Sequence, residues 1–366
     1  MRLHASIAAA LVLATAPLGA RADEPAAALA DPPLVLTVAP GSAGGPWKMK
    51  VQNTGEVPVR IAADARLLTL EVTPPAGSPA EAALKKRGAK PGEPVIAKCE
   101  LPADARPATD EGRELVVPGK RSFSLSFDPL FYCFGVKERG ALVSGATVKA
   151  RFGFAAPAAK AVKGKSPSPT SPFVAAPVGA AVGKLAPAKA IESAPFTLSE
   201  DVKVADATPA TGEGASTPGV EVTTSETLDV SRGSEITVTV TVTNTSDHAV
   251  TTLFRPEMLR FSVSGPAGTV RCGSTRTVAS PIRELFGTLG VKGKTSISVL
   301  VTSLCGFDTF DEAGLYRVTA TFDSSGASGQ SIRLKTWDGE ATAKRPLLLR
   351  VRTPKRPRTT SRPSLD

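Results

Sequence analysis

In Ile236-Thr237-Val238-Thr239-Val240-Thr241-Val242, every second residue is apolar and the residues between are threonines. Because successive side chains of a strand point to opposite faces, this period of two predicts a strand with one buried face. Further stretches of the same kind follow, separated by turns rich in glycine, proline and asparagine, at residues 259–263, 296–301, 315–322 and 347–351. Short strands at this spacing predict an all-β fold, either a sandwich or a barrel.

The same sequence pattern occurs earlier in the chain. Val51-Gln52-Asn53-Thr54 matches Val242-Thr243-Asn244-Thr245, and the matching residues are 191 positions apart. Later matches are 172 to 174 positions apart, and the drop of about 18 indicates one insertion in the first copy, at residues 78–95. A constant offset over many positions predicts that the two halves are repeats of one fold.

The repeat predicts the domain organisation. We expect a first β-sandwich at residues 33–178 and a second at 219–352, joined by an extended, semi-flexible Ala/Pro-rich linker at 179–218. In the first copy, a final edge strand is expected near Phe173, opposite the last strand of the second copy. Residues 353–366 are polar and basic, which predicts a disordered tail. The chain is long enough for two domains with separate cores.

The chain begins with the features of a cleaved export signal. Arg2 and His4 are followed by an apolar stretch at residues 7–18, and small residues lie around Ala22. This order predicts a signal peptide at residues 1–22, cleaved after Ala22; the alternative is an N-terminal core helix. The apolar stretch is shorter than the roughly 20 residues that span a bilayer, and no later stretch comes closer to that length. We therefore expect an exported protein of the periplasm or the extracellular space, with no transmembrane segment.

The positive charge of the chain is concentrated in two segments. The net charge is +10, and loss of the signal peptide removes Arg2 and Arg21 and leaves +8. Residues 155–190 contain five lysines and no acid, and residues 353–366 have a net charge of +3, so these segments account for the whole excess. The remaining parts sum to zero, which argues against a docking face for nucleic acid. We interpret the two segments as flexible and solvent-exposed; the alternative is that they adhere to anionic surface polymers.

Four cysteines fall two in each repeat: Cys99 and Cys133 in the first, Cys272 and Cys305 in the second. In an exported protein this arrangement predicts one disulfide inside each domain. Each would stabilise its domain by roughly 3 to 4 kcal/mol on the chain-entropy model. The alternative, a tetrahedral metal site, requires the four thiols to converge from two domains, so we expect no metal.

The chain has few residues suited to catalysis. His248 is the only histidine left after removal of the signal peptide, and it follows the Asn244 strand in a polar turn. A serine-histidine-aspartate arrangement requires a histidine held by a carboxylate and facing a nucleophile. Asp308, Asp311 and Glu312 lie in a connection before a strand, where solvated acids are usual. We therefore expect no enzyme activity and no cofactor; catalysis by paired carboxylates is the remaining alternative.

Two further features have structural interpretations. Gly293-Lys294-Thr295 is similar to the end of a phosphate-binding loop, but a strand follows it, whereas such a loop needs a helix. We interpret it as a turn that enters a strand. Trp47 is expected in a strand and Trp337 in a hairpin, where a lone indole is more often partial core than a platform for a sugar ring.

The order of these motifs resembles a known class of domain. Between Val240 and Phe322 it comprises Val-x-Val-x-Asn-Thr, then Leu-Arg-Phe-Ser-Val-Ser-Gly-Pro-Ala-Gly, a Gly-Lys turn, and Gly-Leu-Tyr-Arg-Val-Thr-Ala-Thr-Phe. This order resembles the immunoglobulin-like modules of bacterial exported proteins, and it implies two tandem immunoglobulin-like β-sandwich domains. It is also loosely similar to the bacterial intracellular proteinase inhibitor family, which has the Asn-Thr turn and the closing Gly-x-Tyr strand. This chain differs from that family in its export signal, its cysteine pairs and its duplication.

The sequence favours a binding or structural role. We expect a non-enzymatic exported protein of the cell envelope or secreted space, monomeric, that recognises a protein or an anionic surface polymer through loops or sheet edges. The alternative is an inhibitor of an extracellular protease that presents a basic loop. The candidate interaction loop is the insertion at residues 78–95, because surface loops often carry function. Its basic residues are Lys85, Lys86, Arg87 and Lys90.

Overall fold

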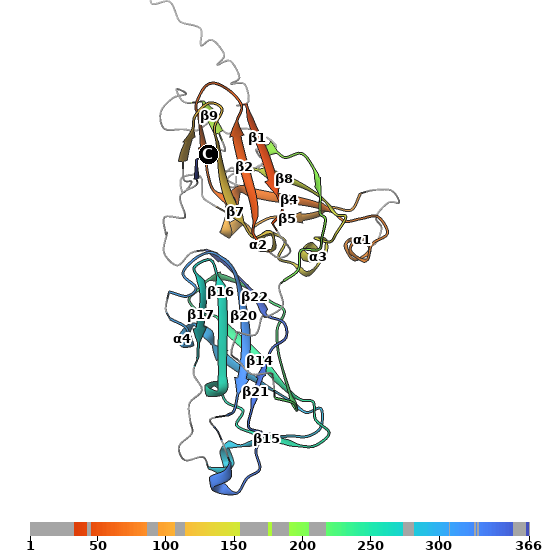
Figure 1. The fold of residues 1–366 in the computed structure, drawn as a ribbon, viewed down its shortest axis with the longest axis vertical. Helices are drawn as coiled ribbons and strands as arrows, with labels where there is room; N and C mark the ends of the chain where they lie inside the picture. The colour runs from red at the N-terminus through yellow and green to blue at the C-terminus, as the bar shows by residue number, and fades with distance from the viewer. Residues whose placement is uncertain are drawn as a thin grey trace, which may run out of the picture. The chain divides into compact units, whose positions relative to one another are not determined.

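The computed structural model describes residues 33–41, 45–85, 94–106, 114–153, 175–177, 190–204, 217–273, 282–306, 308–325, 327, 329–353 and 364–365. The secondary structure of these residues is mainly β and forms several sheets (Figure 1), as the alternating sequence pattern predicts. We call residues 33–204 the first half and residues 217–353 the second half. The signal peptide expected at residues 1–22 lies outside the described residues.

One sheet contains both the first and the last described strand of the chain. Its members are β1 (Leu34–Ala39), β2 (Trp47–Asn53), β7 (Ser122–Phe127) and β23 (Ser364–Leu365). The strand order is β1-β2-β7-β23, and all neighbours are antiparallel. In β2, Trp47, Met49 and Val51 are buried while the residues between them are exposed, so the alternation places one face on the core.

The first half contains two further sheets. The strands of one are β4 (Leu68–Thr73), β5 (Ala97–Cys99), β8 (Thr147–Phe152), β10 (Ile191–Glu192) and β11 (Phe196–Thr197). Their order is β10-β8-β4-β5, and β11 also pairs with β8. The strands of the other are β3 (Val59–Ala62), β6 (Glu114–Val117) and β9 (Ala175–Pro177), in the order β6-β3-β9.

The second half contains two main sheets and one small one. The first consists of β12 (Val220–Thr224), β14 (Thr237–Asn244) and β19 (Lys294–Leu300), in the order β12-β14-β19. The second consists of β13 (Thr227–Arg232), β16 (Leu259–Gly265), β17 (Gly268–Cys272), β20 (Gly314–Asp323), β21 (Glu340–Thr342) and β22 (Leu347–Thr353). Its order is β13-β22-β20-β16-β17, with β21 on β20 and with β13 parallel to β22. The small sheet pairs β15 (Val250–Thr252) with β18 (Gly287–Leu289).

Only short helices connect the strands of the described chain. The α-helices are α1 (Pro79–Leu84), α2 (Pro129–Tyr132), α3 (Val136–Gly140) and α4 (Val301–Leu304). The 3-10 helices are η1 (Ala65–Leu67), η2 (Ala103–Ala105), η3 (Pro256–Met258), η4 (Arg283–Leu285) and η5 (Gln330–Ile332).

The apolar side chains form two core clusters. The first gathers inward residues of β2, β4, β7 and β8, and the second gathers those of β14, β16, β20 and β22. Each core is closed by one disulfide, Cys99–Cys133 in the first half and Cys272–Cys305 in the second. This pairing confirms the prediction from the cysteine positions. It also excludes the alternative thiol metal site, because all four cysteines are used.

A buried asparagine ends one central strand in each half. The Asn53 side chain ends β2 and donates to the carbonyl of Val57 at 2.9 Å, and Asn244 ends β14 and donates to the carbonyl of His248 at 2.8 Å. Both residues are 0% exposed. Each amide also donates to two carbonyls of a later turn, at 3.0 to 3.2 Å, so it joins two turns that are distant in sequence.

The strands that pair with β8 differ from the expectation. The predicted linker at 179–218 contains β10 and β11, which pair with β8 as β22 pairs with β20 in the second half. The Ala150 N–H donates to Ser193 Oγ at 2.9 Å, and Leu198 is buried in the first core. Phe173 lies outside the described residues, and β9 pairs with β3 instead. Residues 190–204 are therefore part of the first-half fold, because backbone pairing and Leu198 hold them there.

The chain end also departs from the expectation of a disordered tail at 353–366. Within that segment, β23 pairs with β7, with Ser364 opposite Ser124 and Leu365 opposite Phe123. Thr353 ends β22, and residues 354–363 and 366 lie outside the described residues. The last described strand is thus hydrogen-bonded to a sheet of the first half.

Candidate functional site

The structure places only one of the four basic residues predicted for the interaction loop. Helix α1 begins in the insertion, where Ser78 Oγ accepts from the Glu81 N–H at 3.1 Å. Glu81 in turn accepts from the Gly77 N–H at 2.7 Å, and this backbone hydrogen bond is the main cause of its lowered pKa. Lys85 Nζ lies 3.1 Å from Glu81, so Lys85, which follows α1 directly, is paired with a residue of that helix. Lys86, Arg87 and Lys90 lie outside the described residues.

The histidine and the acidic residues considered for catalysis form contacts that belong to turns of the fold. His248 is exposed, and its ring lies 2.8 Å from Asp247, which lowers the pKa of that carboxyl. Its carbonyl is the acceptor for Asn244, so the backbone of His248 rather than its ring contributes to the fold. Among Asp308, Asp311 and Glu312, the Glu312 carbonyl accepts from the Tyr316 hydroxyl at 2.7 Å. Over the described ranges, no group of three or more His, Cys, Asp or Glu side chains is placed to hold a metal ion.

The remaining sequence motifs lie in the fold as turns and packed rings. Lys294 begins β19 directly after its turn, as the interpretation of a turn entering a strand requires. Trp47 is buried, with ring centroids 6.0 Å from Phe127. Trp337 stacks on Phe322 at 6.0 Å and precedes β21. None of the helices in the described part of the chain is long and apolar enough to cross a membrane.

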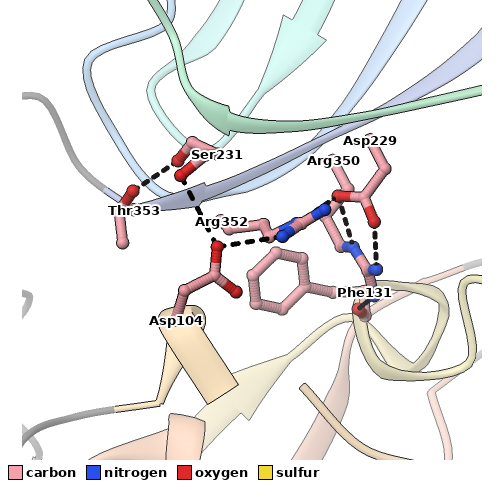
Figure 2. Close-up of polar contacts among 7 residues, drawn as sticks. All are labelled: Asp104, Phe131, Asp229, Ser231, Arg350, Arg352 and Thr353. Carbon is pink, nitrogen blue, oxygen red and sulfur yellow. Dashed lines mark hydrogen bonds and ion pairs between the residues drawn. The ribbon is translucent and has the colours of Figure 1, made fainter. Parts of the chain in front are cut away.

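A polar cluster that the sequence analysis did not predict lies where the second half contacts α2 and η2. We call Asp104, Asp229, Arg350 and Arg352 the guanidinium cluster (Figure 2). Arg350 is on β22, between apolar neighbours, and is only 7% exposed. Its Nε donates to Asp229 at 3.1 Å, and a second guanidinium nitrogen donates to the other oxygen of the same carboxylate. Arg350 and Asp229 therefore form a bidentate ion pair.

The Arg350 guanidinium also contacts the first half. Its Nη1 donates to the carbonyl of Phe131 at 3.2 Å, and its central carbon lies 4.4 Å from the centre of the Phe134 ring. The first contact satisfies a donor that would otherwise be buried alone, and the second is a cation–π contact. One side chain thus contacts β13 of its own half and the α2 segment of the other half.

Arg352 extends the cluster to η2. It donates to Asp229 at 2.8 Å and to Asp104 at 2.9 Å, and the hydroxyl of Ser231 lies 3.5 Å from the same Asp104 oxygen (Figure 2). Burial favours a raised pKa for Asp229, but the hydrogen bonds from Arg350 and Arg352 outweigh it and lower the pKa. The cluster therefore keeps Asp229 ionised between two arginines.

A second contact lies beside the cluster. Asp128 caps α2 by accepting from the Leu130 N–H at 2.9 Å, and it also accepts from Arg317 of β20 at 3.0 Å. Burial raises the pKa of Asp128, against the opposing effect of Arg317. Leu315 and Leu348 of the second half belong to the first core cluster. The contact between the halves thus combines ion pairs with buried apolar area.

No protein-family model and no curated protein matches this chain. Among solved structures, it is similar to a red sea bream transglutaminase at 13% identity, over 86% of this chain and 31% of that chain, with a TM-score of 0.18. It is also similar to a 1.5-MDa bacterial ice-binding adhesin at 8% identity, over 88% of this chain and 66% of that chain, with a TM-score of 0.16. Bacteroides uniformis β-glucuronidase 2 follows at 12% identity, 82% and 26% coverage and a TM-score of 0.15. The chain spans from about a quarter to two-thirds of the length of these proteins.

Proposed function

We propose that this chain is a non-enzymatic binding or structural protein of the cell envelope or secreted space, built from two immunoglobulin-like modules that act as one body. The observation that carries the proposal is the Arg350 contact, because this buried guanidinium bonds to Asp229 of the second half and to the Phe131 carbonyl of the first.

Several contacts support the immunoglobulin-like assignment. The Tyr316 hydroxyl donates to the carbonyl of Glu312, four residues upstream and just before β20, which is the arrangement called a tyrosine corner. Strand β12 belongs to one main sheet of the second half, where it pairs with β14. Strand β13, which follows β12 directly in the chain, lies at the edge of the other main sheet and runs parallel to β22. The asparagine contacts of β2 and β14 support the view that the halves are two copies of one module.

The disulfides support the proposed compartment. Each half has one intramodular bridge, and such bridges form and persist in oxidising surroundings outside the cytosol. A body of two fixed modules suits a binding or structural role, because it holds surfaces on both modules at a constant separation. Binding to a large ligand gains from this rigidity, since less conformational freedom is lost on association.

The test is co-sedimentation of the mature chain, residues 23–366, with isolated bacterial envelopes. We expect the wild-type chain to sediment and the R350M variant to sediment less, although both modules stay folded. R345M is the matched control, because Arg345 is an exposed arginine near the start of β22. Stoichiometric inhibition in a panel of extracellular proteases, or equal sedimentation of R350M and wild type, would count against the proposal.

A further inference from the structure

The outward face of the β1-β2-β7 sheet has a regular polar surface. The exposed residues Lys48 and Lys50 on β2 lie two positions apart, so their side chains leave the same face roughly 6.8 Å from each other. Pairing places Ser126 beside Lys48 and Ser124 beside Lys50 on β7, and Thr37 on the other side of Lys50 on β1. Figure 1 shows these three strands side by side. Hydroxyl groups therefore flank a short row of two cations.

The second half provides a natural comparison. The positions that match Lys48 and Lys50 are Thr239 and Thr241 on β14, 191 residues later, and the facing residues on β19 are again serines. Thr239 lies 2.9 Å from Ser298 and Thr241 lies 3.2 Å from Ser296, so these hydroxyls bond to one another. At these matched positions the sheet face is thus uncharged in the second half and cationic in the first.

The two lysines are available to a ligand. Neither Lys48 nor Lys50 forms an ion pair with another described residue, whereas Lys85, Lys120 and Lys149 all do. No acidic residue occurs in β1, β2 or β7, so nothing on these strands offsets the charge. The far edge of the same sheet pairs with β23.

The chemistry of this face indicates the class of ligand. A lysine ammonium is a point charge without the planar fork of arginine, so it suits separate anionic groups along a chain. Serine and threonine hydroxyls can exchange hydrogen bonds with the hydroxyls of a sugar. None of the outward residues of β1 and β2 is aromatic, and binding of single-stranded nucleic acid typically uses aromatic stacking.

We propose that the outward face of β1, β2 and β7 binds a linear anionic polysaccharide, with Lys48 and Lys50 contacting successive acidic groups. This inference rests on the proposed binding function and assigns it a site and a ligand class. The second-half face, with threonines in place of the lysines, does not bind the polymer.

The experiment compares four chains of residues 23–366 by isothermal titration calorimetry: the wild type, K48T/K50T, T239K/T241K and the control K137T/K335T. Both control lysines are exposed, with Lys137 on α3 and Lys335 in the connection between η5 and β21, so the control loses the same charge away from the proposed site. The probes are polygalacturonate, dextran sulfate, neutral dextran and a single-stranded DNA oligonucleotide. The two anionic polysaccharides distinguish carboxylate from sulfate groups. Urea unfolding of each variant confirms that the fold is retained.

We expect the K48T/K50T variant to bind polygalacturonate or dextran sulfate about five- to thirtyfold more weakly than wild type. The slope of the logarithm of the binding constant against the logarithm of the salt concentration should be smaller in magnitude by about one to two. T239K/T241K should bind more tightly than wild type, and the control should change less than twofold. Equal weakening in the control, or tighter binding of DNA than of either polysaccharide, would overturn the site. Envelope sedimentation without any polysaccharide binding would also overturn it and leave the proposed function standing.

Discussion

Asn244 holds the carbonyl of His248 in the second half as Asn53 holds the carbonyl of Val57 in the first. The two asparagines are 191 positions apart, and so are the two acceptors. Their second sets of acceptors, Val117 and Pro118 in the first half and Leu289 and Gly290 in the second, are 172 apart. An asparagine side chain thus closes the equivalent turn in both halves, although the residues of the turn differ between them.

Replacing either asparagine should destabilise its own half. N53A or N244A leaves three carbonyls without their donor and removes a buried amide, so each should lower the free energy of unfolding by about 2 to 4 kcal/mol. Urea unfolding measures the change. H248A is the control, because only the backbone of His248 takes part, and it should shift the value by less than about 0.5 kcal/mol. A large effect of H248A would show that the imidazole has a role of its own.

Replacing Arg350 should uncouple the two halves. R350A leaves Asp229 paired with Arg352 alone and removes the bond to Phe131, which should lower the free energy of unfolding by about 1.5 to 3 kcal/mol. In differential scanning calorimetry we expect one merged transition for the wild type to separate into two. R345A, at an exposed position, should retain the wild-type profile. A single transition in R350A would mean that the apolar contacts through Leu315 and Leu348 suffice.

The pH dependence of stability should carry opposite signs for two carboxylates. The pKa of Asp229 is lowered in the folded state, so its contribution is present above the unfolded pKa of about 3.9 and is lost as the pH falls through the folded value. D229N should therefore flatten the acid side of the stability curve. Denaturant midpoints between pH 2 and pH 7 measure this slope, and an unchanged slope in D229N would contradict the role of the arginines.

Asp128 provides the contrasting case. Burial raises its pKa, so the folded state binds the proton more tightly and stability from this group falls as the pH rises between the two values. D128N retains a capping side chain and should make the rise of stability with pH steeper. The same titration series measures both variants, and a flatter curve in D128N would show that Arg317 outweighs burial.

The compartment can be tested through the N-terminus and the disulfides. We expect the mature chain from an exporting bacterial host to begin at Asp23, with Cys99–Cys133 and Cys272–Cys305 as its bridges. Intact mass and non-reducing peptide mapping measure both. C99S/C133S and C272S/C305S should each lower the stability of the chain by roughly 3 to 4 kcal/mol. An uncleaved chain, or free thiols in the exported protein, would refute the assignment.

The sequence predicted the central strands because their pattern is long and regular. The stretch that begins at Ile236 alternates over seven residues, and β14 covers Thr237–Asn244. The closing strands of the first half could not be found in this way. Strands β10 and β11 have two residues each, too few to show a period, and they lie in a segment whose alanines and prolines resemble a linker.

The guanidinium cluster was not predictable from local pattern. Strand β22 contains Leu347, Leu348 and Leu349 and is typical of a buried strand, yet Arg350 follows them. The partner of Arg350, Asp229, is 121 positions away in the sequence, and the Phe131 carbonyl is 219 away. The sequence does contain one sign of the cluster. Arg350 and Arg352 lie two positions apart in a largely apolar strand, and a buried charge requires a partner. The identity of that partner is a property of the tertiary fold.

The sheet β1-β2-β7-β23 unites the first and last described strands, and this determines how the chain bears mechanical load. A pulling force applied at the two ends enters through β1 and leaves through β23, both in the same sheet. Only two residue pairs join β23 to β7, whereas six pairs join β1 to β2 and six join β2 to β7, so β23 has the fewest backbone pairs in this sheet. Strand β23 should therefore detach from β7 first, which lengthens the molecule before either disulfide-closed core is strained.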